Sequence, residues 1–457
     1  MVFSSLIFLF RFLPVFLILY YLVPFRFKNF VLFVGSLVFY AWGEPRYAIL
    51  VLFSILINYT LTRFMCSYEP GSRKRKAMFL LAIAYDVGML LVFKYLVFIL
   101  TSIKAAGGLQ FSVPYITLPL GISFYTFQIM SYVIDAYREK CECEKSILNL
   151  GTYLLMFPQL IAGPIVIYEK VSKALKERII STEHIENGFK TFTLGLGAKV
   201  IFANTLGNVW NATDSAGYSN ISTVFAWLGI LSYSLQLYFD FSGYSLMAIG
   251  LGEMLGFDFP KNFDNPYIAR STTEFWRRWH MTLTGWFREY IYIPLGGNRK
   301  VAARTYLNML VVWAITGFWH GAGWNFIVWG LYYFVLLSIE RLFLKNILDK
   351  SRVLSRIYTL VAVMSGWVLF ASDSLTKALS YLSRMFTWHP GEDFVEYIQT
   401  YWYFIIGAMI FATPLFTKYY ENHKKSIPVI IFLVIVFWLS VVLLVDSVYN
   451  PFLYFRF

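Results

Sequence analysis

The stretch Pro428-Val-Ile-Ile-Phe-Leu-Val-Ile-Val-Phe-Trp-Leu-Ser-Val-Val-Leu-Leu-Val445 decides what kind of fold this chain adopts. It contains no charged side chain and is about as long as a helix that crosses the hydrocarbon core of a bilayer. Lipid offers no hydrogen-bond partner to backbone N–H and C=O groups, so a spanning segment satisfies them internally, as an α-helix does. The stretch therefore predicts a transmembrane helix.

The composition of the whole chain points the same way. Of its 457 residues, 58% are hydrophobic, 20% are aromatic and only 14% are charged, whereas a soluble domain carries about 25% charged residues. Such a chain is too apolar for a soluble enzyme, and its three cysteines are too few for a secreted disulfide scaffold. The net charge of +13 fits the Lys and Arg excess of cytoplasmic loops better than it fits nucleic-acid binding.

Fourteen apolar stretches divide the chain, and two of them are unusually polar. Residues 151–167 contain two prolines and a glutamine, and residues 187–209 contain Lys190 and Lys199. Such segments survive at membrane depth only inside protein or beside a water-filled cavity, so we expect these two to be re-entrant or buried. We predict an all-α polytopic membrane protein with about twelve transmembrane helices and a single domain over residues 1–457. The stretches lie near residues 5–23, 29–43, 47–66, 77–101, 116–134, 151–167, 187–209, 221–239, 242–257, 305–319, 324–344, 355–371, 401–417 and 428–447.

The basic loops orient the chain in the membrane. Arg73-Lys-Arg-Lys76 is the strongest basic run, and further basic loops follow at residues 345–356 and 418–425. These loops fall together on the cytoplasmic side if both ends of the chain lie outside. On this map the loop that holds Cys141 and Cys143 is cytoplasmic, so we expect both thiols to be reduced.

The densest group of polar side chains is Ser271-Thr-Thr-Glu-Phe-Trp-Arg-Arg-Trp-His-Met-Thr-Leu-Thr-Gly-Trp-Phe-Arg-Glu-Tyr290. Arg277, Arg278 and Arg288 alternate here with tryptophans, and His280 lies between them. Arginines beside aromatic side chains usually anchor a protein at the lipid headgroups. Their guanidinium groups also suit a phosphorylated ligand, so both interpretations stay open at this point.

Two further ionisable residues lie in apolar surroundings. His320 is in Thr316-Gly-Phe-Trp-His-Gly-Ala-Gly-Trp-Asn325, and Asp240 is in Gln236-Leu-Tyr-Phe-Asp-Phe-Ser-Gly-Tyr-Ser245. An ionisable side chain at membrane depth is costly and is a functional candidate by default. The glycines around His320 predict a helix that ends or bends there, which leaves room beside the imidazole. The structural alternatives are a neutral histidine packed against tryptophan and an aspartate that pairs with an arginine or orients a helix.

At these residues the chain resembles the membrane-bound O-acyltransferase (MBOAT) family, and most of all its AlgI-like bacterial branch, which O-acetylates polysaccharides. The matching strings are spread over residues 1 to about 330, so the resemblance covers most of the chain. They are Met1-Val-Phe-Ser-Ser5, Leu37-Val-Phe-Tyr-Ala-Trp42, Leu118-Pro-Leu-Gly-Ile-Ser-Phe-Tyr125, Phe157-Pro-Gln-Leu-Ile-Ala-Gly-Pro164, Gln236-Leu-Tyr-Phe-Asp-Phe-Ser-Gly-Tyr244, Glu274-Phe-Trp-Arg-Arg-Trp-His280 and Gly317-Phe-Trp-His-Gly321.

The resemblance implies a helical fold around a central tunnel and an acyl-transfer reaction. The family's near-essential histidine maps onto His320, and a second polar residue of the family maps onto His280. The implied donor is cytoplasmic acetyl-CoA, which is a substrate and not a bound cofactor, and we expect no metal. His320 would act as the general base, while His280 would position the acceptor or donate to the oxyanion. The residues expected to bind the substrates are Arg277, Arg278 and Arg288 at the CoA phosphates, together with Asp240, Trp319 and Asn325.

The resemblance also implies a place and partners for this reaction. The protein would lie in the lipid of the bacterial cytoplasmic membrane, with an extracytoplasmic polysaccharide as the final acceptor and an SGNH-hydrolase-like transferase outside as its partner. One alternative is a D-alanyl transferase for teichoic acid that receives its acyl group from a carrier protein. The others are a transporter or lipid flippase that uses His320 and Asp240 as a proton relay, and a catalytically silent scaffold.

Overall fold

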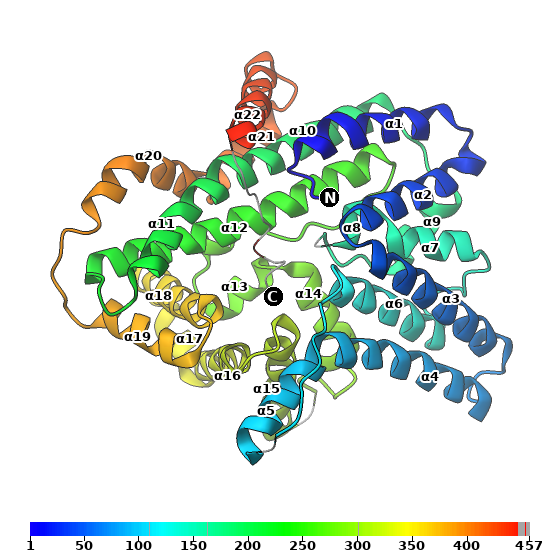
Figure 1. Cartoon of the computed structure of the whole chain (residues 1–457), viewed down its shortest axis with the longest axis horizontal. Helices are drawn as coiled ribbons and strands as arrows, with labels where there is room; N and C mark the ends of the chain where they lie inside the picture. The colour runs from blue at the N-terminus through cyan, green and yellow to red at the C-terminus, as the bar shows by residue number, and fades with distance from the viewer. Residues whose placement is uncertain (109, 162, 300, 447–452, 454–457) are drawn as a thin grey trace. The chain divides into compact units, whose positions relative to one another are not determined.

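The computed structural model describes residues 1–108, 110–161, 163–299, 301–446 and 453. Every regular element in these residues is helical, so the prediction of an all-α protein is confirmed (Figure 1). The helices form two compact units, which we describe separately: residues 1–192 with 245–260, and residues 193–244 with 261–457. The expectation of a single domain over the whole chain stays a prediction.

The first unit is held together by packed helix pairs and by an aromatic core. Helix α3 packs against α4, α2 against α7 and α4 against α6. The core contains Phe3, Phe8, Phe39 and Phe157, all fully buried, with the rings of Phe39 and Phe157 centred 5.4 Å apart. The helices of this unit are α1 (Leu13–Leu22), α2 (Phe25–Gly43), α3 (Pro45–Ser67), α4 (Arg73–Leu90), α5 (Leu96–Gly107), α6 (Ile122–Tyr137), α7 (Ile147–Leu155), α8 (Phe157–Leu160) and α9 (Tyr168–Lys176), with π-helical turns η1 (Phe8–Phe12) and η2 (Leu91–Tyr95) and the start of α10 (Thr182–Gly197).

The polar stretch 151–167 is buried inside this first unit, as its prolines and glutamine predict. All side chains from residue 151 to residue 161 are buried. The hydroxyl of Tyr153 donates to the backbone carbonyl of Val166 at 2.8 Å, and the side-chain amide of Gln159 donates to the carbonyl of Tyr153. Protein groups therefore satisfy the irregular backbone that lipid would leave unpaired.

The second unit contains the helices that carry the predicted site. It contains most of α12 (Thr223–Met254), whose last part belongs to the first unit. The other helices are α11 (Asn204–Ala216), α13 (Thr272–Arg278), α14 (Met281–Phe287), α15 (Ala302–His320), α16 (Trp324–Ile339), α17 (Lys345–Leu348), α18 (Arg352–Ala371), α19 (Leu375–Phe386), α20 (Val395–Phe411), α21 (Pro414–His423) and α22 (Ile427–Asp446), with the short turns η3 (Ala198–Ala203), η4 (Pro266–Ile268), η5 (Arg288–Tyr292) and η6 (Glu340–Leu344).

Helices α15 and α16 lie so close together that only glycine fits at two points of their interface. A Cβ atom on Gly317 would stand 2.3 Å from the backbone oxygen of Phe326, and one on Gly330 would stand 2.3 Å from the oxygen of Trp313. Small residues let two membrane helices approach in this way. Because His320 is the last residue of α15, this close approach sets its position against α16.

The structure has several helices that could cross a membrane, but the count of about twelve crossings is not confirmed. Among the described residues, six helices are long and apolar enough to span a bilayer, or seven if the bent pair α20–α21 counts as one span. The difference arises because some apolar stretches merge and others are too short. Stretches 221–239 and 242–257 form the single helix α12, while stretch 116–134 yields the largely buried, sixteen-residue α6. The six are Pro45–Ser67, Arg73–Gly107, Thr223–Met254, Trp324–Leu348, Arg352–Ala371 and Ile427–Asp446.

Two cysteines that are far apart in the sequence lie close together. Cys66, near the end of α3, and Cys143, in the loop after α6, have their Cα atoms 6.5 Å apart, so the end of α3 and this loop lie side by side in the first unit. Cys141 is a free cysteine. The expectation that Cys141 and Cys143 are reduced stays a prediction.

Candidate active site

His320 ends helix α15 inside a cage of aromatic rings. Its side chain is only 5% exposed. The rings of Trp329, Trp319 and Phe370 are centred 4.9, 5.0 and 5.4 Å from the imidazole, each nearly perpendicular to it. The histidine therefore lies where the glycine-rich sequence predicts, at a helix end.

A narrow apolar cavity lies directly beside His320. Its volume is about 10 Å³, which is at most enough for one water molecule. Aromatic side chains make up most of its wall and offer water few hydrogen-bond partners. Its lining residues are Leu237, Phe241, Trp276, Trp279, His320, Trp329, Trp367 and Phe370.

His280 occupies the corner between α13 and α14. Its backbone is left-handed, with φ 44° and ψ 54°, a conformation that residues other than glycine rarely adopt. The side chain is 1% exposed, its ring stands edge-on against Phe241 at 4.7 Å, and Trp319 is centred 6.4 Å away. Burial lowers the pKa of His280 to about 3, so the imidazole is neutral at physiological pH. The two predicted histidines therefore both lie against Trp319.

The sequence around His280 explains why the chain turns there. Ser271 caps α13 by accepting the backbone N–H of Glu274 at 3.0 Å. The buried carboxylate of Glu340 accepts the backbone N–H and the hydroxyl of both Thr272 and Thr273, at 2.6 to 3.0 Å. An anion at a helix N-terminus is favourable, so these groups pin a short helix that would not persist alone.

The predicted phosphate-binding arginines are divided by the structure. Arg277 and Arg278 line a cavity of about 860 Å³, whereas Arg288 lies in η5 and is not among its lining residues. Arg278 pairs with Glu274 at 2.9 Å and with Asp264 at 3.0 Å. Arg277 forms no ion pair within the described part of the chain, so its guanidinium group remains available to an anion. The further charged residues at this cavity are Arg270, Arg341, Lys345, Glu340 and Asp349.

Comparisons with known proteins identify the family of this chain. The membrane-bound O-acyltransferase family model matches residues 37–375, a range that contains both histidines. The chain belongs to the membrane-bound O-acyltransferase family. It is 40% identical over 392 residues to a probable alginate O-acetylase AlgI of Azotobacter vinelandii, covering 85% of this chain and 78% of the relative. It is 35% identical over 422 residues to a peptidoglycan O-acetyltransferase of Helicobacter pylori, covering 84% and 80%.

A more distant similarity bears on the teichoic acid alternative. The acyltransferase is 30% identical over 256 residues to a teichoic acid D-alanyltransferase of Streptococcus thermophilus. That match covers 51% of this chain and 60% of the relative. The acetyltransferases therefore resemble the chain over a larger share of its length and at higher identity.

Two residues that the sequence suggests as substrate ligands make internal bonds in this acyltransferase. Asp240 of α12 forms a buried ion pair with Lys199 and accepts the backbone N–H of Leu453 at 2.7 Å. Its partner is thus a lysine and not the arginine considered from the sequence. The side-chain amide of Asn325 donates to the carbonyl of Ser372 at 3.0 Å.

Sequence reasoning missed several residues that shape the site. Asn262 contacts His280 and Thr282 through its side-chain oxygen, and Glu340 holds the start of α13. Trp367 and Phe370 reach the cavity from α18. One signal for Asn262 was available, because it belongs to a polar run, Lys261-Asn-Phe-Asp264, shortly before the arginine-rich segment. The sequence carries no comparable signal for Glu340, because this residue lies 68 positions from the first of the two threonines that it binds.

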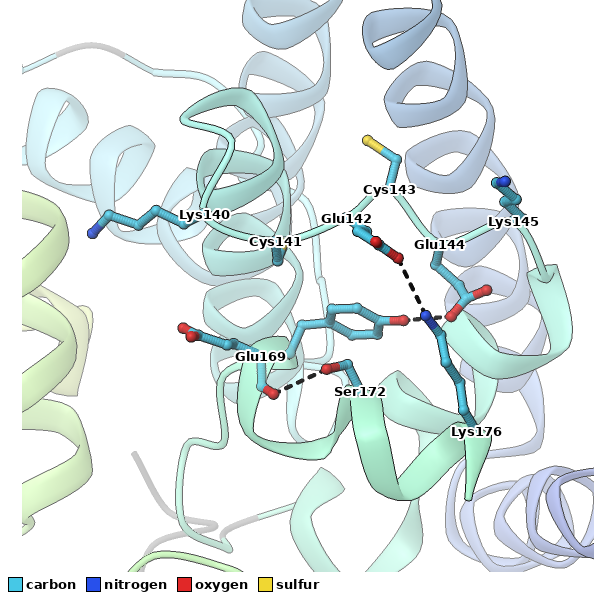
Figure 2. A pocket seen from close by; sticks show the side chains of 10 residues that line it. Lys140, Cys141, Glu142, Cys143, Glu144, Lys145, Glu169, Ser172 and Lys176 are labelled. Atoms are coloured by element: carbon cyan, nitrogen blue, oxygen red, sulfur yellow. Dashed lines mark hydrogen bonds and ion pairs between the residues drawn. The ribbon is translucent and has the colours of Figure 1, made fainter. Parts of the chain in front are cut away.

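The first unit has a polar pocket of its own, which contains none of the predicted site residues. It encloses about 370 Å³ between the loop after α6 and helix α9. Figure 2 shows Lys176 directed at Glu142. The ammonium nitrogen and the carboxylate oxygen of this ion pair lie 3.3 Å apart, and the hydroxyl of Tyr168 donates to the carboxylate of Glu144. Burial raises the pKa of the Cys141 thiol in its wall to about 12, so the thiol stays protonated and unreactive at neutral pH. Across the described ranges, no three His, Cys, Asp or Glu side chains are placed to hold a metal ion.

Proposed function

We propose that this protein is an O-acetyltransferase of the bacterial cytoplasmic membrane. It passes an acetyl group from cytoplasmic acetyl-CoA towards an extracytoplasmic polysaccharide, either an alginate-like polymer or a cell-wall glycan. The observation that carries the proposal is the pair of buried histidines against Trp319, of which His320 lines a narrow aromatic cavity. That pair lies in a chain 40% identical to a probable alginate O-acetylase.

The chemistry proposed for the pair is a single acyl transfer. The imidazole of His320 removes the proton of an acceptor hydroxyl as the oxygen attacks the thioester carbonyl of acetyl-CoA. The carbon–sulfur bond breaks, the CoA thiolate takes up the proton from His320, and the new ester leaves with the acceptor. The aromatic wall limits hydrolysis because it keeps water away from the thioester.

The proposed entrance for the donor is the charged cavity beside α13. Arg277 lines it without an ion pair in the described residues, and guanidinium groups bind phosphate oxygens in a fork. Helix α13 carries Arg277 and ends two residues before His280. In this scheme one short helix therefore connects the side chain that binds the phosphates of the donor with the histidine near its thioester. Acetyl-CoA binds as a substrate in this scheme, and no permanently bound cofactor is needed.

The acceptor side needs a second protein. A polysaccharide hydroxyl outside the membrane does not reach a cytoplasmic thioester directly, so we propose relay to an SGNH-hydrolase-like transferase on the outer face. The relatives named for alginate and for peptidoglycan favour a glycan as the final acceptor. The shorter match to a teichoic acid D-alanyltransferase supports D-alanyl transfer from a carrier protein as the second candidate.

Thioester turnover by the purified protein tests the proposal. The protein in nanodiscs receives labelled acetyl-CoA, with and without the outer transferase, and His320→Ala is compared with wild type. We expect His320→Ala to lower acetyl transfer by at least about 100-fold, the usual worth of a general base. His423→Ala is the matched control, because this exposed histidine lies on α21 and its removal should leave turnover unchanged.

Each result assigns a different function. Equal turnover by wild type and His320→Ala would remove His320 from the mechanism. Absence of acetyl-CoA turnover, with D-alanyl transfer from a loaded carrier protein, would select the second candidate. Substrate-driven flux without any acyl transfer would show a transporter instead.

A further inference from the structure

The side chain of Asn262 contacts His280 in a way that fixes where the histidine carries its proton. The amide oxygen of Asn262 accepts the backbone N–H of Thr282 at 3.2 Å and lies 2.9 Å from the Thr282 hydroxyl. The same oxygen lies 3.1 Å from Nδ1 of His280. Asn262 and His280 are both 1% exposed, so no bulk water competes for these contacts.

The orientation of this amide is determined by chemistry. A backbone N–H only donates, so the Asn262 atom that faces Thr282 must be the oxygen and not the nitrogen. That oxygen only accepts, and therefore Nδ1 of His280 must be the donor in their contact. A neutral imidazole has one N–H, and burial keeps His280 neutral by lowering its pKa. Its other nitrogen, Nε2, then carries the lone pair.

Asn262 also holds the backbone on which this ring stands. Its main-chain carbonyl accepts the N–H of Met281, the residue after His280, at 2.9 Å. The carbonyl of Arg278 accepts the N–H of Asp264 at 2.9 Å, so segments 262–264 and 278–282 are tied side by side. Left-handed backbone at a histidine persists only where its surroundings enforce it. Ring and backbone are thus set by the same asparagine.

We propose that Asn262 is a positioning residue that holds His280 in its Nδ1–H tautomer, so that Nε2 accepts a hydrogen bond from a hydroxyl of the acceptor. The proposal rests on the acetyl transfer proposed above and decides between two roles for His280. A neutral ring with its proton on Nδ1 does not donate from Nε2 to an oxyanion. His280 therefore orients the acceptor, while His320 removes the proton.

The tautomer is measured directly, without any substrate. The protein is labelled with ¹³C,¹⁵N-histidine in proteoliposomes. Solid-state NMR separates protonated from bare ring nitrogens, and correlation with the bonded Cγ or Cδ2 tells Nδ1 from Nε2. The His280→Gln variant identifies the signals of His280 among the five histidines. We expect wild-type His280 to show a protonated Nδ1 and a bare Nε2. Asn262→Asp should keep this pattern because its carboxylate still accepts from Nδ1, whereas Asn262→Ala should give a mixture of tautomers.

Turnover of the same variants completes the test. We expect Asn262→Ala to lower kcat about 10- to 100-fold, as the loss of an orienting partner does, with an unchanged KM for acetyl-CoA. Asn262→Asp should recover most of that loss. The matched control is Asn308→Ala, which removes another buried asparagine that donates to the carbonyls of Leu295 and Gly297 and should leave the His280 tautomer unchanged.

Two outcomes would overturn the proposal. One is a protonated Nε2 on wild-type His280, and the other is an unaltered tautomer with unaltered turnover in Asn262→Ala. If Asn262→Ala does not fold, the tautomer of His280 in the wild-type protein and in Asn262→Asp still tests the proposal. Failure of acetyl transfer itself is recognised separately, because the wild type would then show the Nδ1–H signal but no turnover.

Discussion

His320 and His280 are both buried, yet their neighbours give them different chemistry. His320 is enclosed by tryptophan and phenylalanine rings. His280 lies against an amide oxygen that has a second, unambiguous donor, so its tautomer is set before any substrate arrives. In the proposed scheme, ring contacts therefore surround the proton acceptor, and a polar contact fixes the orienting group.

The burial of His280 makes the fold sensitive to acid. An unfolded histidine takes up a proton near pH ~6.5, while in the folded chain burial lowers the pKa of His280 to about 3. The unfolded chain therefore binds more protons between these pH values, and the free energy of unfolding falls as the pH drops through that window. At pH 5 this residue alone costs about 2 kcal/mol of stability relative to neutral pH.

Replacing His280 should remove this part of the acid sensitivity. We expect His280→Gln to lose less thermal stability than wild type between pH 7 and pH 5, measured as the unfolding temperature in one detergent. His423→Gln is the control, because the exposed His423 on α21 should leave the acid sensitivity as it is in wild type. Equal pH dependence in wild type and His280→Gln would show that His280 is protonated in the folded chain.

At the scale of helices, the site depends on how closely α15 approaches α16. A side chain on Gly317 would collide with the backbone oxygen of Phe326. A backbone atom cannot move aside as the end of a flexible side chain can. His320 follows Gly317 by three residues, almost one helical turn, so a shift of α15 is transmitted to the imidazole. A helix contact therefore fixes the geometry of a side chain at its end.

A methyl group at Gly317 should disturb both stability and turnover. We expect Gly317→Ala to lower the free energy of unfolding by about 1–3 kcal/mol through overpacking, and to reduce kcat because His320 moves. The matched control is Gly285→Ala in α14, where a Cβ atom would meet nothing within 4 Å. That control should be neutral or slightly stabilising, as alanine favours helix. Equal effects of the two substitutions would mean that α15 and α16 tolerate separation.

For the whole molecule, the sequence predicts the helical class and the burial of most of the stretch 151–167, because apolar runs and the polar residues that interrupt them are local signals. It does not predict how stretches combine, since 221–239 and 242–257 make one helix. Contacts between distant residues escape it as well. Asp240 pairs with a lysine 41 positions away, and Glu340 clamps a helix start 68 residues before it. Such pairs depend on tertiary packing, which periodicity does not encode.

The excess of positive charge in the molecule gives the last prediction. The chain carries a net charge of +13. Arg277 lines a cavity of about 860 Å³ and forms no ion pair among the residues described. If this cavity receives the CoA phosphates, Arg277→Gln should raise the KM for acetyl-CoA about 5-fold or more, as the loss of one charge-assisted hydrogen bond does. The KM for S-acetylpantetheine, which lacks the nucleotide phosphates, should stay unchanged.

The comparison of the two donors separates phosphate binding from a general disturbance. Arg304→Gln is the control, because Arg304 is exposed near the start of α15 and is not among the residues that line this cavity. Raising the salt concentration should weaken acetyl-CoA binding by wild type more than by Arg277→Gln, since salt screens exposed charges. An equal rise in KM for both donors would place the phosphates elsewhere and leave Arg277 as an anchor at the lipid headgroups.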